Sequence, residues 1–103
     1  MKVLSTIPLF PAGQIVATPG ALALLEQAKK MPAEFLSRHL CGDWGDALGP
    51  DDNAENELSL KQGFRLFSVY TVRAAEKLWI ITEADRSVTT LLLPSEYSSV
   101  FHK

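Results

Sequence analysis

The sequence predicts an α+β fold in which two to three N-terminal helices pack on a C-terminal, three-stranded antiparallel β-meander. The first observation is a helical spacing of apolar residues, interrupted by proline and glycine, between residues 19 and 62. The second is a change in residue composition at Gly63, after which β-branched and aromatic residues dominate. The third is size, because 103 residues that are 47% hydrophobic and 21% charged suffice for one core but not for two. We therefore expect a single domain, 1–103, made of an extended arm (1–13), a helical part (14–62), the sheet (63–94) and a tail (95–103).

The helical part carries start and stop signals for three helices. Thr18–Pro19 suits an N-cap followed by the first helical position, where proline loses no hydrogen bond. Pro32 ends this helix and opens a second one, which we expect to stop at Gly42. A short third helix is expected over roughly Asp52 to Gln62, with Gly63 as its left-handed C-terminal residue.

Three runs of strand length follow Gly63, separated by RAAE and ADR, which are short enough for antiparallel hairpins: FRLFSVYTV, KLWIITE and SVTTLLL. The first run has apolar residues on both faces. We therefore expect the helices to cover one face, and the arm or a partner subunit to cover part of the other. Pro94 ends the last run, and the tail offers Tyr97 and Phe101 for docking.

Charge and missing motifs exclude several classes of function. The net charge of −2 and the scattered basic residues argue against nucleic-acid binding by bulk charge. Acid is concentrated from Asp43 to Glu57, with six carboxylates, which indicates first a solvated loop and helix start, and otherwise a cation site or a surface for a basic partner. Walker A, GxGxxG, GxSxG, HExxH and paired CxxC motifs are absent from the sequence, so we expect no cofactor and no classical hydrolase.

The cysteine count and the lengths of the apolar runs predict the cellular compartment of the protein. The single cysteine excludes an intramolecular disulfide, and no apolar run approaches the ~20 residues of a spanning helix. We expect a cytoplasmic protein that does not enter a membrane.

The densest group of reactive side chains is RHLCGDWGD, residues 38–46. In the structural interpretation it is a tight turn in which the aspartates cap N–H groups and Trp44 covers the edge of the core. In the alternative, an exposed Trp44 between Asp43 and Asp46 binds a partner that carries basic groups. We expect no metal, because the usual four-ligand sets of zinc sites are absent.

His39 and the segment ITEADRSVTT are the remaining places for chemistry. His39 is expected at the core edge, hydrogen-bonded to a carbonyl, or else as a general base. Glu83, Asp85 and Arg86 are expected at a hairpin tip as turn residues with a local ion pair. The sharper alternative has Arg86 hold an anion while Glu83 or His39 moves a proton, as a metal-independent ribonuclease requires.

Four blocks, GQIVATPGAL, RHLCGDWGD, ENELSLKQGFRLFSVYT and LWIITEADRSVTTLLLPSEY, resemble a family of small bacterial proteins carried on plasmids and integrative elements. Some members are labelled as the M subunit of a restriction-modification system, but this chain lacks a glycine-rich cofactor loop and the length such a domain requires. The resemblance implies no activity. It implies the context of an accessory protein of mobile DNA, one that modulates host defence or element maintenance.

Two hypotheses of different classes follow. The first is a non-enzymatic interaction module that binds a protein partner or a second copy of the chain through Asp43, Trp44, Asp46, Asp85, Arg86 and Thr90. The second is a small ribonuclease-like toxin domain whose catalytic residues are His39, Glu83 and Arg86. Both require the glycine bend after the second helix and the last hairpin tip to lie side by side on the surface.

Overall fold

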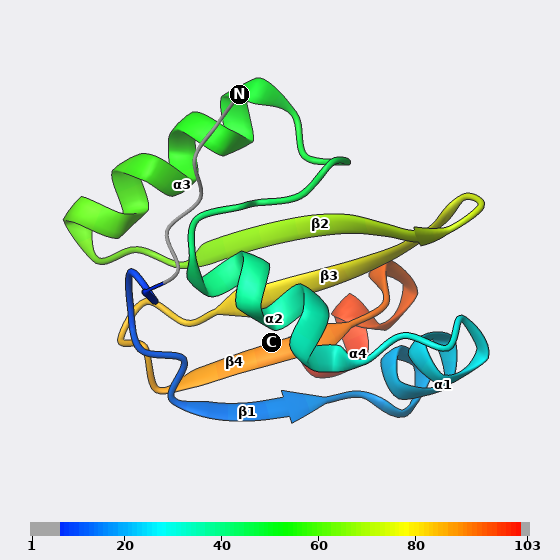
Figure 1. The fold of residues 1–103 in the computed structure, drawn as a ribbon. Helices are drawn as coiled ribbons and strands as arrows, with labels where there is room; N and C mark the ends of the chain where they lie inside the picture. Colours follow the sequence, from blue (N-terminus) through cyan, green and yellow to red (C-terminus); the bar gives the residue numbers. More distant parts are fainter. Residues whose placement is uncertain (1–6, 102–103) are drawn as a thin grey trace.

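The computed structural model describes residues 7–101 and has an α+β architecture with a four-stranded mixed sheet. The elements are β1 (Gln14–Ala17), α1 (Pro19–Gln27), α2 (Pro32–Leu40), α3 (Pro50–Gln62), β2 (Leu66–Arg73), β3 (Glu76–Thr82), β4 (Val88–Leu92), the 3-10 turn η1 (Pro94–Glu96) and α4 (Tyr97–Val100). The strand order is β1-β4-β3-β2, as Figure 1 shows. Residues 1–6 of the expected arm and 102–103 of the expected tail lie outside the described residues.

The expected antiparallel meander is present as β2, β3 and β4, but the sheet prediction was incomplete because β1 joins it. β1 pairs in parallel with β4, and the N–H groups of Gln14 and Thr18 donate to the carbonyls of Ser87 (2.9 Å) and Leu91 (3.0 Å). Gly13 makes this approach possible, since its φ is 65° and a Cβ there would lie 2.3 Å from the Ser87 carbonyl oxygen. Segment 14–17 therefore belongs to the sheet and not to the helical part.

The helix signals of the sequence are confirmed. The Thr18 hydroxyl accepts the N–H of Ala21 at 3.1 Å and caps α1. Gly63 ends α3 in the left-handed conformation, with φ of 79°. α3 begins at Pro50, two residues before the expected start.

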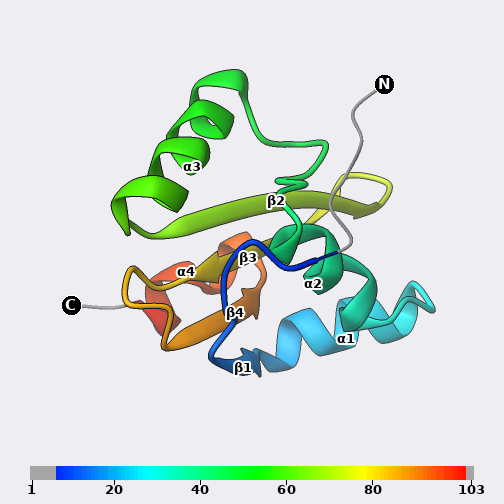
Figure 2. The ribbon, with the colours of Figure 1, turned by 60° about the vertical axis from the view of Figure 1, so that its left-hand side comes forward.

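The helices α1 and α2 cover one face of the sheet, and η1 and α4 lie on the other (Figures 1 and 2). Alternation along the strands turns one set of side chains to the helices, where they form the main core: Ala21, Leu24, Leu25, Phe35, Tyr70, Val72, Leu78, Ile80 and Leu91. On the opposite face, Tyr97 packs edge-on against Trp79, with ring centroids 5.7 Å apart. The tail of the chain therefore covers part of the second face, whereas Phe10, in the described part of the arm, packs against His39 and Trp44.

The outer edge of β2 is occupied between Phe67 and Thr71. The Asn56 side chain of α3 accepts the N–H of Phe67 (3.0 Å) and donates to its carbonyl (2.6 Å). Val69 exchanges backbone hydrogen bonds with Trp44 and Ala47, at 3.0 and 3.2 Å. These contacts satisfy backbone groups that would otherwise be open to a foreign strand.

Replacing Asn56 by alanine is expected to destabilise the protein by about 1–3 kcal/mol, because both polar groups of Phe67 lose their partner beneath α3. Glu55→Ala is the matched control on the exposed side of the same helix, with an expected effect within about 0.5 kcal/mol. Urea unfolding of both variants measures the difference. Equal stabilities would show that the Asn56 amide is dispensable.

Candidate binding site

Trp44 lies in the interior and not on the surface. It is 2% exposed, its ring is stacked on Phe10 (centroids 6.3 Å apart) and meets His39 edge-on (5.7 Å). The indole N–H donates to the Glu57 carboxylate of α3 at 2.7 Å. The geometry agrees with the structural interpretation of RHLCGDWGD and leaves no indole face for a partner.

The two aspartates of this segment form the turn. Asp43 pairs with Arg38 at 2.6 Å and accepts the N–H of Gly45 at 3.1 Å. Asp46 accepts the backbone N–H of Thr71 at 2.8 Å. Burial raises the pKa of Asp46, but the hydrogen bonds from Thr71 outweigh it and hold this pKa below its ordinary value. Gly45 is required here, because its φ is 102° and a Cβ would lie 2.0 Å from the Val69 carbonyl oxygen.

His39 is a fully buried residue of α2, and its ring lies within a chain of hydroxyl groups. Its Nδ1 lies 2.5 Å from the Ser68 hydroxyl and its Nε2 lies 2.9 Å from the Thr82 hydroxyl. Thr89 donates its one proton to the Ala12 carbonyl (2.7 Å), so it accepts the proton of Thr82 (2.8 Å). Thr82 must then accept from His39, which fixes the neutral Nε2–H tautomer with Nδ1 as acceptor of the Ser68 proton.

This environment favours the structural interpretation of His39. Burial, with a smaller contribution from the charge of Arg86, lowers the pKa of His39 from 6.5 to about 3. Both ring nitrogens are hydrogen-bonded, and the partners are hydroxyls and not the expected carbonyl. The ring is therefore shielded from any substrate at the surface.

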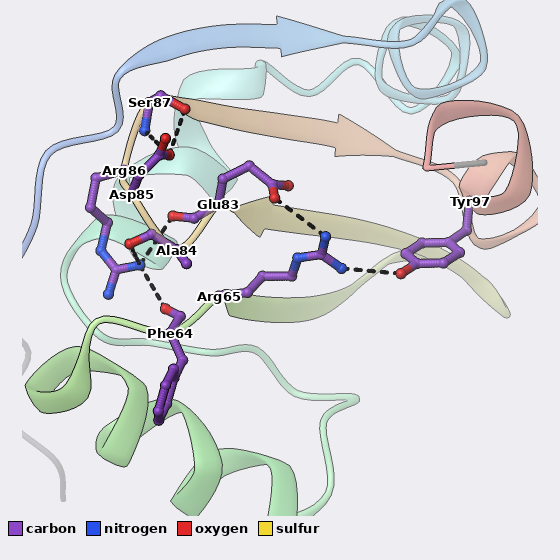
Figure 3. Close-up of polar contacts among 8 residues, drawn as sticks. All are labelled: Phe64, Arg65, Glu83, Ala84, Asp85, Arg86, Ser87 and Tyr97. Atoms are coloured by element: carbon purple, nitrogen blue, oxygen red, sulfur yellow. Dashed lines mark hydrogen bonds and ion pairs between the residues drawn. The ribbon is translucent and has the colours of Figure 1, made fainter. Parts of the chain in front are cut away.

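Arg86 joins the hairpin tip to the C-terminal end of α3. Its Nη1 donates to the carbonyls of Phe64 (2.6 Å), Glu83 (3.1 Å) and Ala84 (3.2 Å), and its Nη2 donates to the Ser59 carbonyl (3.1 Å). A cation is favoured at this end of a helix. Figure 3 shows the guanidinium turned toward Phe64 and away from Arg65. The guanidinium of Arg86 thus binds four backbone carbonyl oxygens.

Glu83, Asp85 and Thr90 have separate roles. Glu83 pairs with Arg65 at 3.3 Å, and Figure 3 shows this pair reaching toward Tyr97. Asp85 accepts both the N–H and the hydroxyl of Ser87, at 3.0 and 2.6 Å, and so shapes the tip. Thr90 is buried in β4, with 4% of its surface exposed.

The structure does not bring His39, Glu83 and Arg86 together in one site. Thr82 faces His39, whereas Glu83, the residue that follows β3, pairs with Arg65 on the side of the sheet that carries Tyr97. The glycine bend and the hairpin tip do meet in one region, since Phe10 contacts both Trp44 and the Arg86 guanidinium (5.6 Å to the ring centroid). Their groups make internal contacts.

A hollow on the other sheet face is a candidate for binding. This aromatic groove has a volume of about 340 Å³ and is lined by Arg65, Phe67, Trp79, Ile81 and Tyr97. Phe67 and Trp79 meet edge-on at 5.0 Å, and Arg65 donates to the Tyr97 hydroxyl at 3.1 Å. Sequence reasoning missed the groove. The available signal was the presence of apolar residues on both faces of the first strand run.

The chain matches no protein-family model, no curated protein sequence and no solved structure in the comparisons made.

Within residues 7–101, no group of three or more His, Cys, Asp or Glu side chains is placed to hold a metal ion. None of the helices in the described part of the chain is long and apolar enough to cross a membrane.

Proposed function

We propose that this protein is a non-catalytic binding module that receives an apolar or aromatic side chain of a protein partner in the aromatic groove. The groove itself is the observation that carries the proposal. Its volume lies within the ~300–1,000 Å³ typical of ligand pockets, and its walls are mainly apolar with few polar groups. Half-exposed aromatic rings such as Trp79 and Tyr97 are also the side chains most often found at the centre of interfaces.

Arg65 supplies the polar part of this recognition. Its guanidinium donates to the Tyr97 hydroxyl (3.1 Å) and to the Glu83 carboxylate (3.3 Å). The guanidinium Cζ lies over the Phe101 ring, 5.0 Å from the ring centroid. These two hydrogen bonds use only part of the five N–H groups of an arginine. A partner that places a carbonyl or carboxylate oxygen beside its apolar side chain would complete the set.

The residues first expected to bind a partner are not retained in this proposal, because Trp44 and Thr90 are buried and Arg86 is bound to four carbonyls. The ribonuclease-like alternative is not retained either, since His39 and Glu83 face opposite sides of the sheet. An accessory role on mobile DNA rests on the resemblance of sequence blocks and stays a prediction.

The proposal is tested by selecting a random peptide library, displayed on phage, against the immobilised protein. We expect enriched peptides to share an aromatic or large aliphatic residue next to an acidic or polar one. Trp79→Ala should weaken their binding at least tenfold in calorimetric titration, the effect of losing a central interface residue worth about 1.4 kcal/mol or more.

Phe64→Ala is the control for this experiment, because Phe64 is an aromatic residue that is 55% exposed and does not line the groove. It should leave peptide binding unchanged. Unchanged binding in both variants, or selection of no peptide at all, would contradict the proposal. Thermal unfolding of Trp79→Ala shows whether the variant is folded under the conditions of the titration.

A further inference from the structure

Among residues 7–101, one edge of the sheet, at β2, is covered by other segments, and the other edge, at β1, pairs with no further strand. β1 forms the lower edge in Figure 1. The N–H groups of Gln14 and Thr18 point to β4, so the alternation of a strand turns the N–H and C=O groups of Ile15 and Ala17 outward. These are the groups to which a further strand hydrogen-bonds.

β1 is short, but its sequence, QIVA, carries neither the charge nor the proline that often protects an edge strand from pairing. Ile15 is 51% exposed and Val16 is 37% exposed, on opposite faces of the strand. The contrast with β2 is clear, because Asn56 and the 44–47 segment occupy the outer edge of that strand.

We infer that a second copy of the chain adds its own β1 to this edge, antiparallel and about a two-fold axis at Val16, to give an eight-stranded sheet. In this register Ile15 pairs with the partner subunit's Ala17, and by symmetry Ala17 pairs with the partner subunit's Ile15. All outward N–H and C=O groups of these two residues are then used. A register centred on Ile15 would require Gly13 in an extended strand, but the φ of Gly13 is 65°.

The character of β1 favours a second copy over a different strand. An uncharged strand meets no like charge when it pairs with itself, and it carries no charge that would select another sequence. At the two-fold axis, Val16 meets Val16 of the partner subunit in a close, non-hydrogen-bonded pair, which places two β-branched side chains in contact. The four-residue edge is short, so the association should depend on concentration.

Sedimentation equilibrium over increasing protein concentration measures this association. The wild-type chain should shift from monomer mass toward dimer mass as concentration rises. Val16→Lys places two ammonium groups opposite each other at the axis and should give monomer mass throughout. Leu58→Lys is the matched control, an equally apolar position on α3 that is 50% exposed, and it should dimerise like the wild type.

A cross-link reports the register separately from affinity. In a Cys41→Ser background, Val16→Cys places two cysteines across a pair whose Cα atoms lie about 4.5 Å apart, within the range for a disulfide. Mild oxidation should give a covalent dimer. Gln14→Cys on the same face should not, because the two cysteines would be roughly 14 Å apart along the strands.

Monomer mass for the wild type up to concentrations on the order of 1 mM would overturn the inference. So would a dimer that Val16→Lys leaves intact, or equal cross-linking at positions 14 and 16. Trp79, the groove residue replaced in the peptide experiment, lies on β3 and not on β1, so the result of that experiment is independent of this one.

Discussion

Replacing Trp44 with alanine is expected to destabilise the protein by about 3–5 kcal/mol, the cost of removing a large buried aromatic side chain. The loss comprises the contacts with Phe10 and His39 and the hydrogen bond to Glu57. Natural domains have only about 5–15 kcal/mol of total stability, so the variant should be partly unfolded or close to it. Thermal unfolding should show a fall in Tm of at least roughly 12 °C for a chain of this size.

Two further variants separate burial from aromatic character. Trp44→Phe retains a ring between Phe10 and His39 and loses the Glu57 hydrogen bond, so its cost should be about 1 kcal/mol. Trp79→Ala removes the half-exposed tryptophan of the groove and should cost less than Trp44→Ala. If Trp44→Ala unfolded like the wild type, the segment 38–46 would have to be a mobile surface loop and not part of the core.

Signals that act between near neighbours allowed much of the fold to be predicted from the sequence. Thr18–Pro19 and Gly63 mark helix ends through bonds and dihedrals within a few residues, and both were located correctly. The three C-terminal strands followed from their β-branched and aromatic composition and from the short turns between them. β1 was missed because four residues give little periodicity, and its partner strand lies more than 70 positions along the chain.

The candidate site was less accessible to such reasoning, because its residues meet only through tertiary contacts. Nothing local to Arg86 shows that the carbonyl of Ser59, 27 positions earlier, is its partner. The aromatic groove depends on the register of β2 and β3, which places Phe67 opposite Ile81 and Val69 opposite Trp79. Apolar residues on both faces of a strand showed that a second surface existed, but not where it is hollow.

His39 should make the stability of the protein depend on pH. Above pH 6.5 the ring is neutral in the folded and unfolded chains, so its contribution is constant. Between pH 6.5 and about 3 the unfolded chain binds a proton that the folded chain does not, because burial lowers the pKa of His39 to about 3. The free energy of unfolding should therefore fall with decreasing pH, by about 1.4 kcal/mol for each pH unit in this window.

The fixed tautomer provides the control for this prediction. His39→Gln retains an N–H donor near the Nε2 position, toward Thr82, but has no group that titrates. Carboxylates with lowered pKa, such as Asp46 and Glu96, contribute to the acid sensitivity of both proteins, so the difference between the two curves isolates the histidine. Urea unfolding at several pH values between 7 and 4 should give a shallower curve for the variant. Parallel curves would mean that His39 takes up a proton in the folded state, and the hydroxyl chain through Ser68, Thr82 and Thr89 would then have to accommodate a cation.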